Sequence, residues 1–388
     1  MVLSAFFKAR WGIVGLLSLV AAFVCVAFPH GLPLRAGASA VALSAIVSFI
    51  HLRHAGLAVL VAFAPLPGLL IAHAFGFADP LTIALCYLPG LACAMFMADE
   101  IAANIAHGFE RRAACEDVLA KLGMSMGAAI GVASIGLAIL ALSPGPAVFA
   151  ATLGAGVSAI LIVPLGASDL PFGEDFVTRA NRVREWRERM LDPVSAITQP
   201  RWAMSASGIA VIFAVLGYFG AHPVFDATEY AVFAALLLSA SIAGFGLTWE
   251  WRRALALPLV LALLILIGMW GLEQIHARNA LTPLVQTLGI CAVPLVLVAV
   301  EASGHLTEDA ASASSFALMR KGPAAIFFFA ASALVMLFQI GDAPLVGALV
   351  VMLLFGCAST LLWLPALACA FETLFPRRSA LDARYRVH

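Results

Sequence analysis

Long apolar stretches alternate with short polar connections along the whole chain. A stretch of about 17 to 25 apolar residues is long enough to cross a bilayer as a helix. The first half is expected to supply spans at 10–29, 36–52, 55–75, 80–106, 124–142 and 147–165. The second half is expected to supply spans at 202–220, 227–249, 254–272, 281–304, 323–340 and 344–375. The pattern predicts an all-α polytopic membrane protein with about twelve transmembrane helices.

The composition agrees with this prediction. Hydrophobic residues make up 63% of the 388 residues and charged residues only 11%, and the mean hydropathy is +1.02. Soluble domains have an apolar share of about 45 to 50%, so the solvent of most of this chain is expected to be lipid. No small-residue cleavage motif precedes Pro29. The first apolar run is therefore expected to be a retained helix and not a cleaved signal peptide.

The distribution of basic residues predicts the orientation. If the N-terminus is cytoplasmic, every Lys and Arg except Arg35 and Arg278 falls in a cytoplasmic connection or tail. Cytoplasmic connections of membrane proteins are enriched in Lys and Arg, so both termini are expected inside the cell. The connections on the outer side hold few residues and are too short to form a folded domain.

The two halves repeat with an offset of about 200 residues. Arg10-Trp11 corresponds to Arg201-Trp202, and Ser158 with Pro164 corresponds to Ser359 with Pro365. Units with an even number of spans enter the membrane from the same side, which predicts parallel repeats. The expected divisions are a first six-helix repeat (1–166), a cytoplasmic linker (167–201), a second six-helix repeat (202–376) and a cytoplasmic tail (377–388).

Within the linker, apolar residues recur at helical spacing between charged residues. Phe176, Val183 and Trp186 belong to this stripe. The pattern favours an amphipathic helix over about 174–191 that lies at the membrane interface. A solvated charged linker is the alternative interpretation.

Acidic residues within the apolar spans are the candidate functional residues. Asp99 and Glu100 lie near the end of the span at 80–106, and Glu301 lies at the matching place in the second half. A carboxylate in the hydrocarbon region costs about 2.5 to 3.5 kcal/mol on insertion scales, and such residues usually face the bundle interior and carry protons, ions or substrate. Desolvation and a neighbouring acid both favour the protonated carboxyl, so these residues are expected to form a proton relay. The alternative is that the acids are hydrated at the membrane boundary.

Polar residues follow each acid at helical spacing. Glu100, Asn104 and His107 share one helix face, and Glu301 and His305 share another. Asn104, His107 and His305 are therefore expected to support the acids by hydrogen bonding. Glu100 and Glu301 are expected to be equivalent repeat positions, with spans four and ten packed face to face at the centre of the bundle.

The remaining polar residues point to few other functions. His51 and His54, at a predicted cytoplasmic end, are expected to contact headgroups or water. The seven cysteines contain no CxxC pair, and neither a metal site nor a cofactor is indicated. No loop offers a nucleophile with its base or a phosphate-binding glycine loop, so an enzyme is not expected. With zero net charge and no basic stripe, nucleic acid is not an expected partner.

The region around the acids resembles the resistance-nodulation-division (RND) superfamily. The resemblance rests on LACAMFMADEIAANIAHGFERR, on the second copy VEASGHLTEDAASASSFALMRKGPAAIFFFAASALVML, and on LLWLPAL in the last span. It implies an MMPL-like transmembrane core in which Asp99 and Glu100 occupy the proton-carrying positions of the drug-efflux branch. Glu301 falls near a position that is acidic in the lipid-exporter branch. Superfamily members carry large extracytoplasmic domains where this chain has only 30–35 and 221–226.

The sequence thus leads to two hypotheses. The first is a multi-pass protein of the bacterial inner membrane that handles a hydrophobic small molecule or lipid, coupled to protons through its intramembrane carboxylates. The second is a non-transporting scaffold or accessory subunit that docks a partner membrane or periplasmic protein, or an enzyme. The bilayer itself is the one partner that both hypotheses share.

Overall fold

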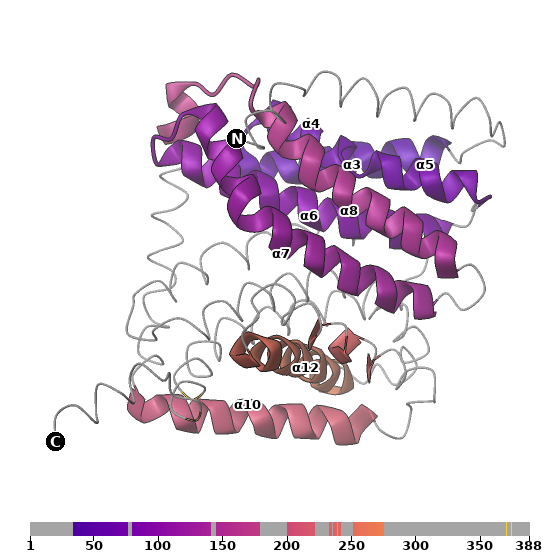
Figure 1. Cartoon of the computed structure of the whole chain (residues 1–388), viewed down its shortest axis with the longest axis vertical. Helices are drawn as coiled ribbons and strands as arrows, with labels where there is room; N and C mark the ends of the chain where they lie inside the picture. Colours follow the sequence, from indigo (N-terminus) through magenta and orange to yellow (C-terminus); the bar gives the residue numbers. More distant parts are fainter. Residues whose placement is uncertain are drawn as a thin grey trace.

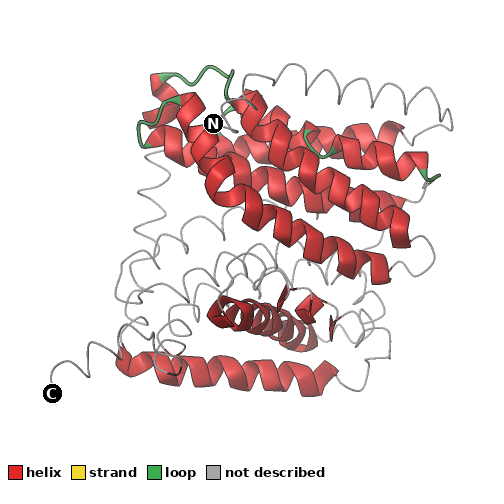
Figure 2. Ribbon diagram, viewed as in Figure 1, coloured by secondary structure: helices red, strands yellow, loops and turns green. Residues whose placement is uncertain are grey.

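The structure is a computed structural model that describes residues 34–76, 80–140, 145–178, 200–221 and 251–274, with isolated residues between 233 and 241 and at 370 and 374. Every regular element in this part of the chain is a helix (Figure 2). Three segments are long and apolar enough to cross a membrane: Ala55–Ala72, Cys86–Ala106 and Pro146–Ala167. Counting the bent pair Arg111–Ala120 and Leu122–Ile135 as one span gives a fourth. An all-α membrane architecture is supported, while the number twelve and the orientation stay predictions.

The helices follow the apolar runs of the sequence closely. Those of the first half are α3 (Leu34–Leu52), α4 (Ala55–Phe63), α5 (Leu66–Ala74), α6 (Pro80–Ala106), α7 (Arg111–Leu140) and α8 (Gly145–Ala167). Helix α6 has the predicted bounds. Helix α7 begins at Arg111 and not at 124, because the charged segment before the apolar run contains good helix formers and no proline.

Helix α3 has the polarity of a membrane helix, with its polar residues buried and its large apolar residues exposed. Ser44, Ser48 and His51 are buried, whereas Ile46, Phe49 and Ile50 are each about half exposed. The two sets lie on opposite faces, because residues three and four apart share a face of a helix. This inverted arrangement fits a helix whose outer face contacts lipid.

Small residues let α8 pack closely against its neighbours. Figure 1 shows α8 lying along α6 and α7, and α8 also contacts α4 and α5. A Cβ atom added to Gly68 of α5 would lie 2.5 Å from the Ala151 carbonyl oxygen of α8, and one added to Gly90 of α6 would lie 2.8 Å from the Ala155 backbone. Close backbone approach through small residues is a common way to associate membrane helices. Gly90, which follows Pro89, thus marks a tight helix contact.

The predicted span at 55–75 is divided into α4 and α5 around Pro65. The Gly68 amide donates to the Pro65 carbonyl at 3.0 Å, so it does not continue the regular pattern to Ala64. The Ser158 hydroxyl of α8 instead donates to the Ala64 carbonyl at 2.8 Å, and the Tyr87 hydroxyl of α6 donates to the Ala62 carbonyl at 2.8 Å. Neighbouring helices therefore satisfy backbone groups that lipid could not.

In the second half, α10 (Pro200–Ala221) and α12 (Trp251–Gln274) are described and pack together (Figure 1). Gly217 lies against the Leu266 backbone, and the rings of Phe213 and Trp270 are 4.5 Å apart. These helices correspond to the predicted spans 202–220 and 254–272. Several predicted spans lie wholly or mostly outside the described residues: 10–29, 281–304 and 323–340 wholly, and 227–249 and 344–375 mostly. The prediction that the two halves are structural repeats is therefore untested. Of the predicted linker helix, a helical turn is described from residue 174 to 178.

Candidate functional site

A buried histidine and a largely buried acid meet between α3 and α6. His51 lies in the last turn of α3, and Asp99 follows the buried run 91–98 of α6. The His51 Nε2 atom lies 3.0 Å from Asp99 Oδ1, and the side chains are 1% and 13% exposed. The ring N–H is not aligned with the oxygen as a strong hydrogen bond requires, so the contact is an ion pair when His51 is protonated.

The expectation that His51 contacts headgroups or water is wrong. The chain reverses immediately after α3, where Arg53 adopts a left-handed backbone with φ of 55°. Arg53 is exposed, but His51 lies on the same face of α3 as Ser44 and Ser48 and turns inward. The signal in the sequence was the spacing of these three residues, which gives an otherwise apolar helix one polar face.

The other predicted site residues of α6 continue toward the end of the helix. Glu100 is partly exposed. The Asn104 amide nitrogen donates to Asp117 Oδ2 of α7 at 3.0 Å, which ties the two helices together. His107 is exposed, and its Nδ1 lies 2.6 Å from the Ala103 carbonyl oxygen in the preceding turn. Asp99 thus contacts an ionisable partner, His51, on another helix.

The second-half members of the predicted relay, Glu301 and His305, lie outside the described residues, and so does the predicted packing of span four on span ten. The supporting roles of Asn104, His107 and His305 stay predictions. Within the described ranges, no group of three or more His, Cys, Asp and Glu side chains could hold a metal ion.

A second cluster of contacts lies where α3 meets α4 and fastens the segment that follows α8. His54 Nδ1 accepts from the Leu57 amide at 3.1 Å and so caps α4, which leaves Nε2 to donate to the Pro171 carbonyl at 2.9 Å. The His54 ring also contacts Phe172 and Phe176, with centroids 4.6 and 5.5 Å away. Phe176 is buried, so the start of the linker is held against the bundle.

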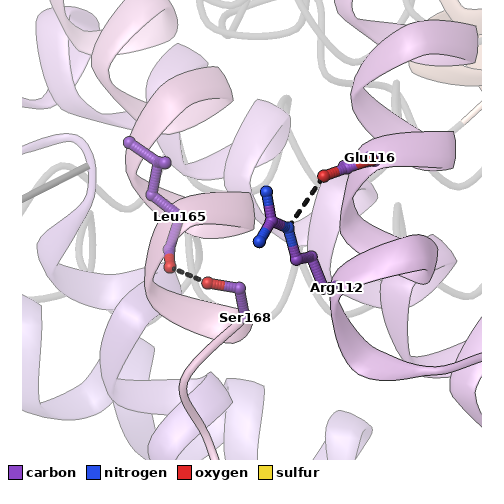
Figure 3. Close-up of polar contacts among 4 residues, drawn as sticks. All are labelled: Arg112, Glu116, Leu165 and Ser168. Carbon is purple, nitrogen blue, oxygen red and sulfur yellow. Dashed lines mark hydrogen bonds and ion pairs between the residues drawn. The ribbon is translucent and has the colours of Figure 1, made fainter. Parts of the chain in front are cut away.

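The start of α7 contributes further contacts to the same region. Arg111 Nη1 donates to the Leu170 carbonyl at 2.9 Å. Figure 3 shows Arg112 held by Glu116 of its own helix at 2.9 Å, near the end of α8, where the Ser168 hydroxyl donates to the Leu165 carbonyl at 2.7 Å. Of these contacts, the bond of Arg111 joins the start of α7 to the segment that follows α8, and the other two stabilise the ends of their own helices.

Comparison with known proteins identifies a distant structural relative. No protein-family profile and no curated protein matches the chain. The fold is similar to that of SecDF, a member of the RND superfamily, in its super-membrane-facing form. The TM-score is 0.53 at 11% sequence identity, and the match covers 90% of this chain and 63% of the SecDF chain. The chain therefore spans less than two thirds of the length of SecDF, and the likeness is one of overall fold.

Proposed function

We propose that this chain is a proton-coupled membrane protein of the RND type that handles a hydrophobic small molecule or lipid. The observation that carries the proposal is the contact of His51 with Asp99, which joins two helices of a membrane bundle and leaves the side chains only 1% and 13% exposed. Buried ionisable residues in such bundles are costly and usually functional. The SecDF-like fold and the inverted polarity of α3 support the same conclusion.

The pair can exist in states of different charge. When His51 is protonated and Asp99 is ionised, the two charges attract each other and hold the end of α3 against α6. A proton that binds Asp99 removes this attraction and leaves the imidazolium buried without its counter-ion, which is unfavourable in a low-dielectric interior. The end of α3 then moves to rehydrate His51 or to release its proton. Imidazole suits this role because its two ring nitrogens can donate or accept a proton.

The substrate is proposed to reach the protein through the bilayer. Large apolar side chains are exposed on the described helices, among them Phe49, Phe63 and Ile212. The predicted extracytoplasmic connections are short, which leaves little protein outside the membrane to capture a water-soluble molecule. A hydrophobic molecule or lipid that partitions into the membrane needs no such domain. The bacterial inner membrane is the proposed location.

Proton uptake into proteoliposomes tests the coupling. The purified full chain is reconstituted into liposomes that contain a pH-sensitive dye, and an inward pH gradient is applied with and without a membrane potential. Asp99→Asn and Glu100→Gln are compared with Asp117→Asn, an acid of α7 outside the pair. The proposal expects uptake that Asp99→Asn abolishes and Asp117→Asn preserves. Equal uptake by wild type and Asp99→Asn would show that the pair does not carry protons.

A non-transporting scaffold or accessory subunit is the second candidate. It is favoured by the match to only 63% of the SecDF chain, because a region that matches part of a larger protein can work together with a partner. In that case the chain would copurify with a membrane or periplasmic partner at fixed stoichiometry after crosslinking in cells. Copurification that survives Asp99→Asn, together with no proton uptake by the purified chain, would select this function.

A further inference from the structure

The buried face of α3 continues from His51 toward the middle of the helix. We define the polar seam as Ser44, Ser48 and His51, which lie on one face at spacings of four and three residues. All three are buried, and Ser44 and Ser48 have no exposed surface. At one end of the seam His51 contacts Asp99 of α6, and at the other end Ser44 lies beside Tyr87, which also belongs to α6.

The serine hydroxyls of the seam lack hydrogen-bond partners among the described residues. Ser48 Oγ has none, and Ser44 Oγ lies near the Tyr87 hydroxyl but outside hydrogen-bond geometry. By contrast, the buried Ser134 hydroxyl of α7 donates to the Ile130 carbonyl in its own helix at 2.6 Å. Buried polar groups in native proteins are nearly always paired with protein or ordered water. Two adjacent unpaired hydroxyls on one buried face therefore indicate bound water.

The spacing of the seam suits single water molecules. Along a helix, Ser44 and Ser48 are about 6 Å apart and Ser48 and His51 about 4.5 Å apart, since each residue rises 1.5 Å. One water molecule spans a gap of this size, because it makes hydrogen bonds of about 2.8 Å on both sides. Serine hydroxyls and water each donate and accept, so they form an unbroken chain of hydrogen bonds.

We propose that ordered water binds along the polar seam and conducts protons to the His51–Asp99 pair, an inference that rests on the proposed proton coupling. At each step one O–H bond forms as another breaks, so no net charge stays on Ser44 or Ser48. Tyr87 is a positioning residue. Its hydroxyl proton is used in the bond to the Ala62 carbonyl, so its oxygen can only accept from the seam.

A cation fits the seam less well than water. The seam contains the basic group of His51 and ends at the carboxylate of Asp99. The remaining oxygens are those of Ser44, Ser48 and Tyr87, whereas hard cations such as Ca²⁺ take six to eight oxygen ligands. A protonated His51 would also repel the ion.

The test replaces a serine of the polar seam by a larger apolar residue and leaves His51 and Asp99 unchanged. Ser48→Val replaces the hydroxyl by a bulkier apolar group that excludes water. The matched control is Ser134→Val, at a buried serine whose hydroxyl is satisfied within its own helix. In the proteoliposome assay, Ser48→Val is expected to slow proton uptake by about tenfold or more, because the proton loses hydrogen bonds along its route. Ser134→Val is expected to keep the wild-type rate.

A spectroscopic measurement detects the water directly. Infrared difference spectra recorded on acidification in H₂¹⁶O and H₂¹⁸O should show an isotope-sensitive O–H band that Ser48→Val removes and Ser134→Val retains. If Ser48→Val does not fold, Ser48→Ala serves instead, since it leaves room for water and should slow uptake less than about threefold while shifting the band.

The outcomes separate the two proposals. If Asp99→Asn abolishes uptake but Ser48→Val does not alter it, protons reach the pair by another route and the seam proposal fails alone. If Asp99→Asn has no effect, the proposed function fails. Uptake that requires Na⁺ or K⁺ and lacks the water band would identify the seam as a cation site and would also overturn the proposal.

Discussion

Replacing Ser158 by alanine should destabilise the bundle, because the Ser158 hydroxyl donates a hydrogen bond to a backbone carbonyl at the break between α4 and α5. Ser158 is 5% exposed, and its Oγ lies 2.8 Å from the Ala64 carbonyl of another helix and 3.0 Å from the Ala155 carbonyl of its own. Ala64 is completely buried, and the Gly68 amide donates to Pro65 instead. Ser158→Ala therefore leaves the Ala64 carbonyl without the donor that the structure gives it.

The expected size follows from two bounds. Hydrogen bonds between membrane helices average about 0.6 kcal/mol and reach about 1.7 kcal/mol. A buried polar group left unsatisfied costs about 1 to 3 kcal/mol. We expect Ser158→Ala to lower the free energy of unfolding by about 1 to 2 kcal/mol, since the Ala64 carbonyl lies where water cannot replace the hydroxyl.

Ser134→Ala is the matched control for this prediction. It removes the same atom from a completely buried serine whose bond runs to the Ile130 carbonyl of its own helix. It should cost less than about 0.5 kcal/mol, because no bond between helices is lost. Reversible unfolding in mixed micelles titrated with dodecyl sulfate, followed by circular dichroism, gives both values. Equal destabilisation by the two variants would refute the role assigned to Ser158.

Three further predictions concern packing and capping. Gly90→Leu should prevent assembly of the bundle, because the leucine side chain would meet the α8 backbone. Gly127→Leu should fold, because no atom lies within 4 Å of a Cβ added there. The monodispersity of each variant in detergent checks both expectations. His54→Ala should lower the free energy of unfolding by about 1 kcal/mol, because it removes the cap of α4. An unchanged midpoint in the titration with dodecyl sulfate would contradict this prediction. Cys115, which is completely buried, should react with maleimide only after unfolding; rapid labelling of the native chain would contradict its position.

The sequence predicted the helices better than it predicted their contacts. Apolar runs define spans through the thickness of the bilayer, which is why α6 has its predicted bounds and α8 differs from its expected span by two residues at each end. The span predicted at 55–75 is broken at Pro65, because proline lacks the amide N–H that a helix interior needs. The partner at this break, Ser158, however, lies 94 residues from Ala64, and nothing local in the sequence identifies such a contact.

The same limit applies to the candidate site. Helical spacing places Asp99 and Glu100 about 100° apart on one helix but does not say which other helix each of them faces. The partner of Asp99 proved to be His51, whose position before Arg53 had suggested a residue at the membrane boundary. The Asn104 amide, expected to support the acids of its own helix, donates to Asp117 of α7.

The two faces of α6 differ in a way that bears on the proposed coupling. On one side Gly90 lies against the α8 backbone, a contact that cannot loosen without opening a void along both helices. On the other side α3 meets α6 through the His51–Asp99 pair, whose attraction depends on the charge of both groups. A change in the protonation of His51 or Asp99 therefore alters the contact between α6 and α3 and leaves the contact between α6 and α8 intact. We expect α6 and α8 to act as a fixed unit against which α3 moves, which makes α3 the element that converts the proton's arrival into a rearrangement of the bundle.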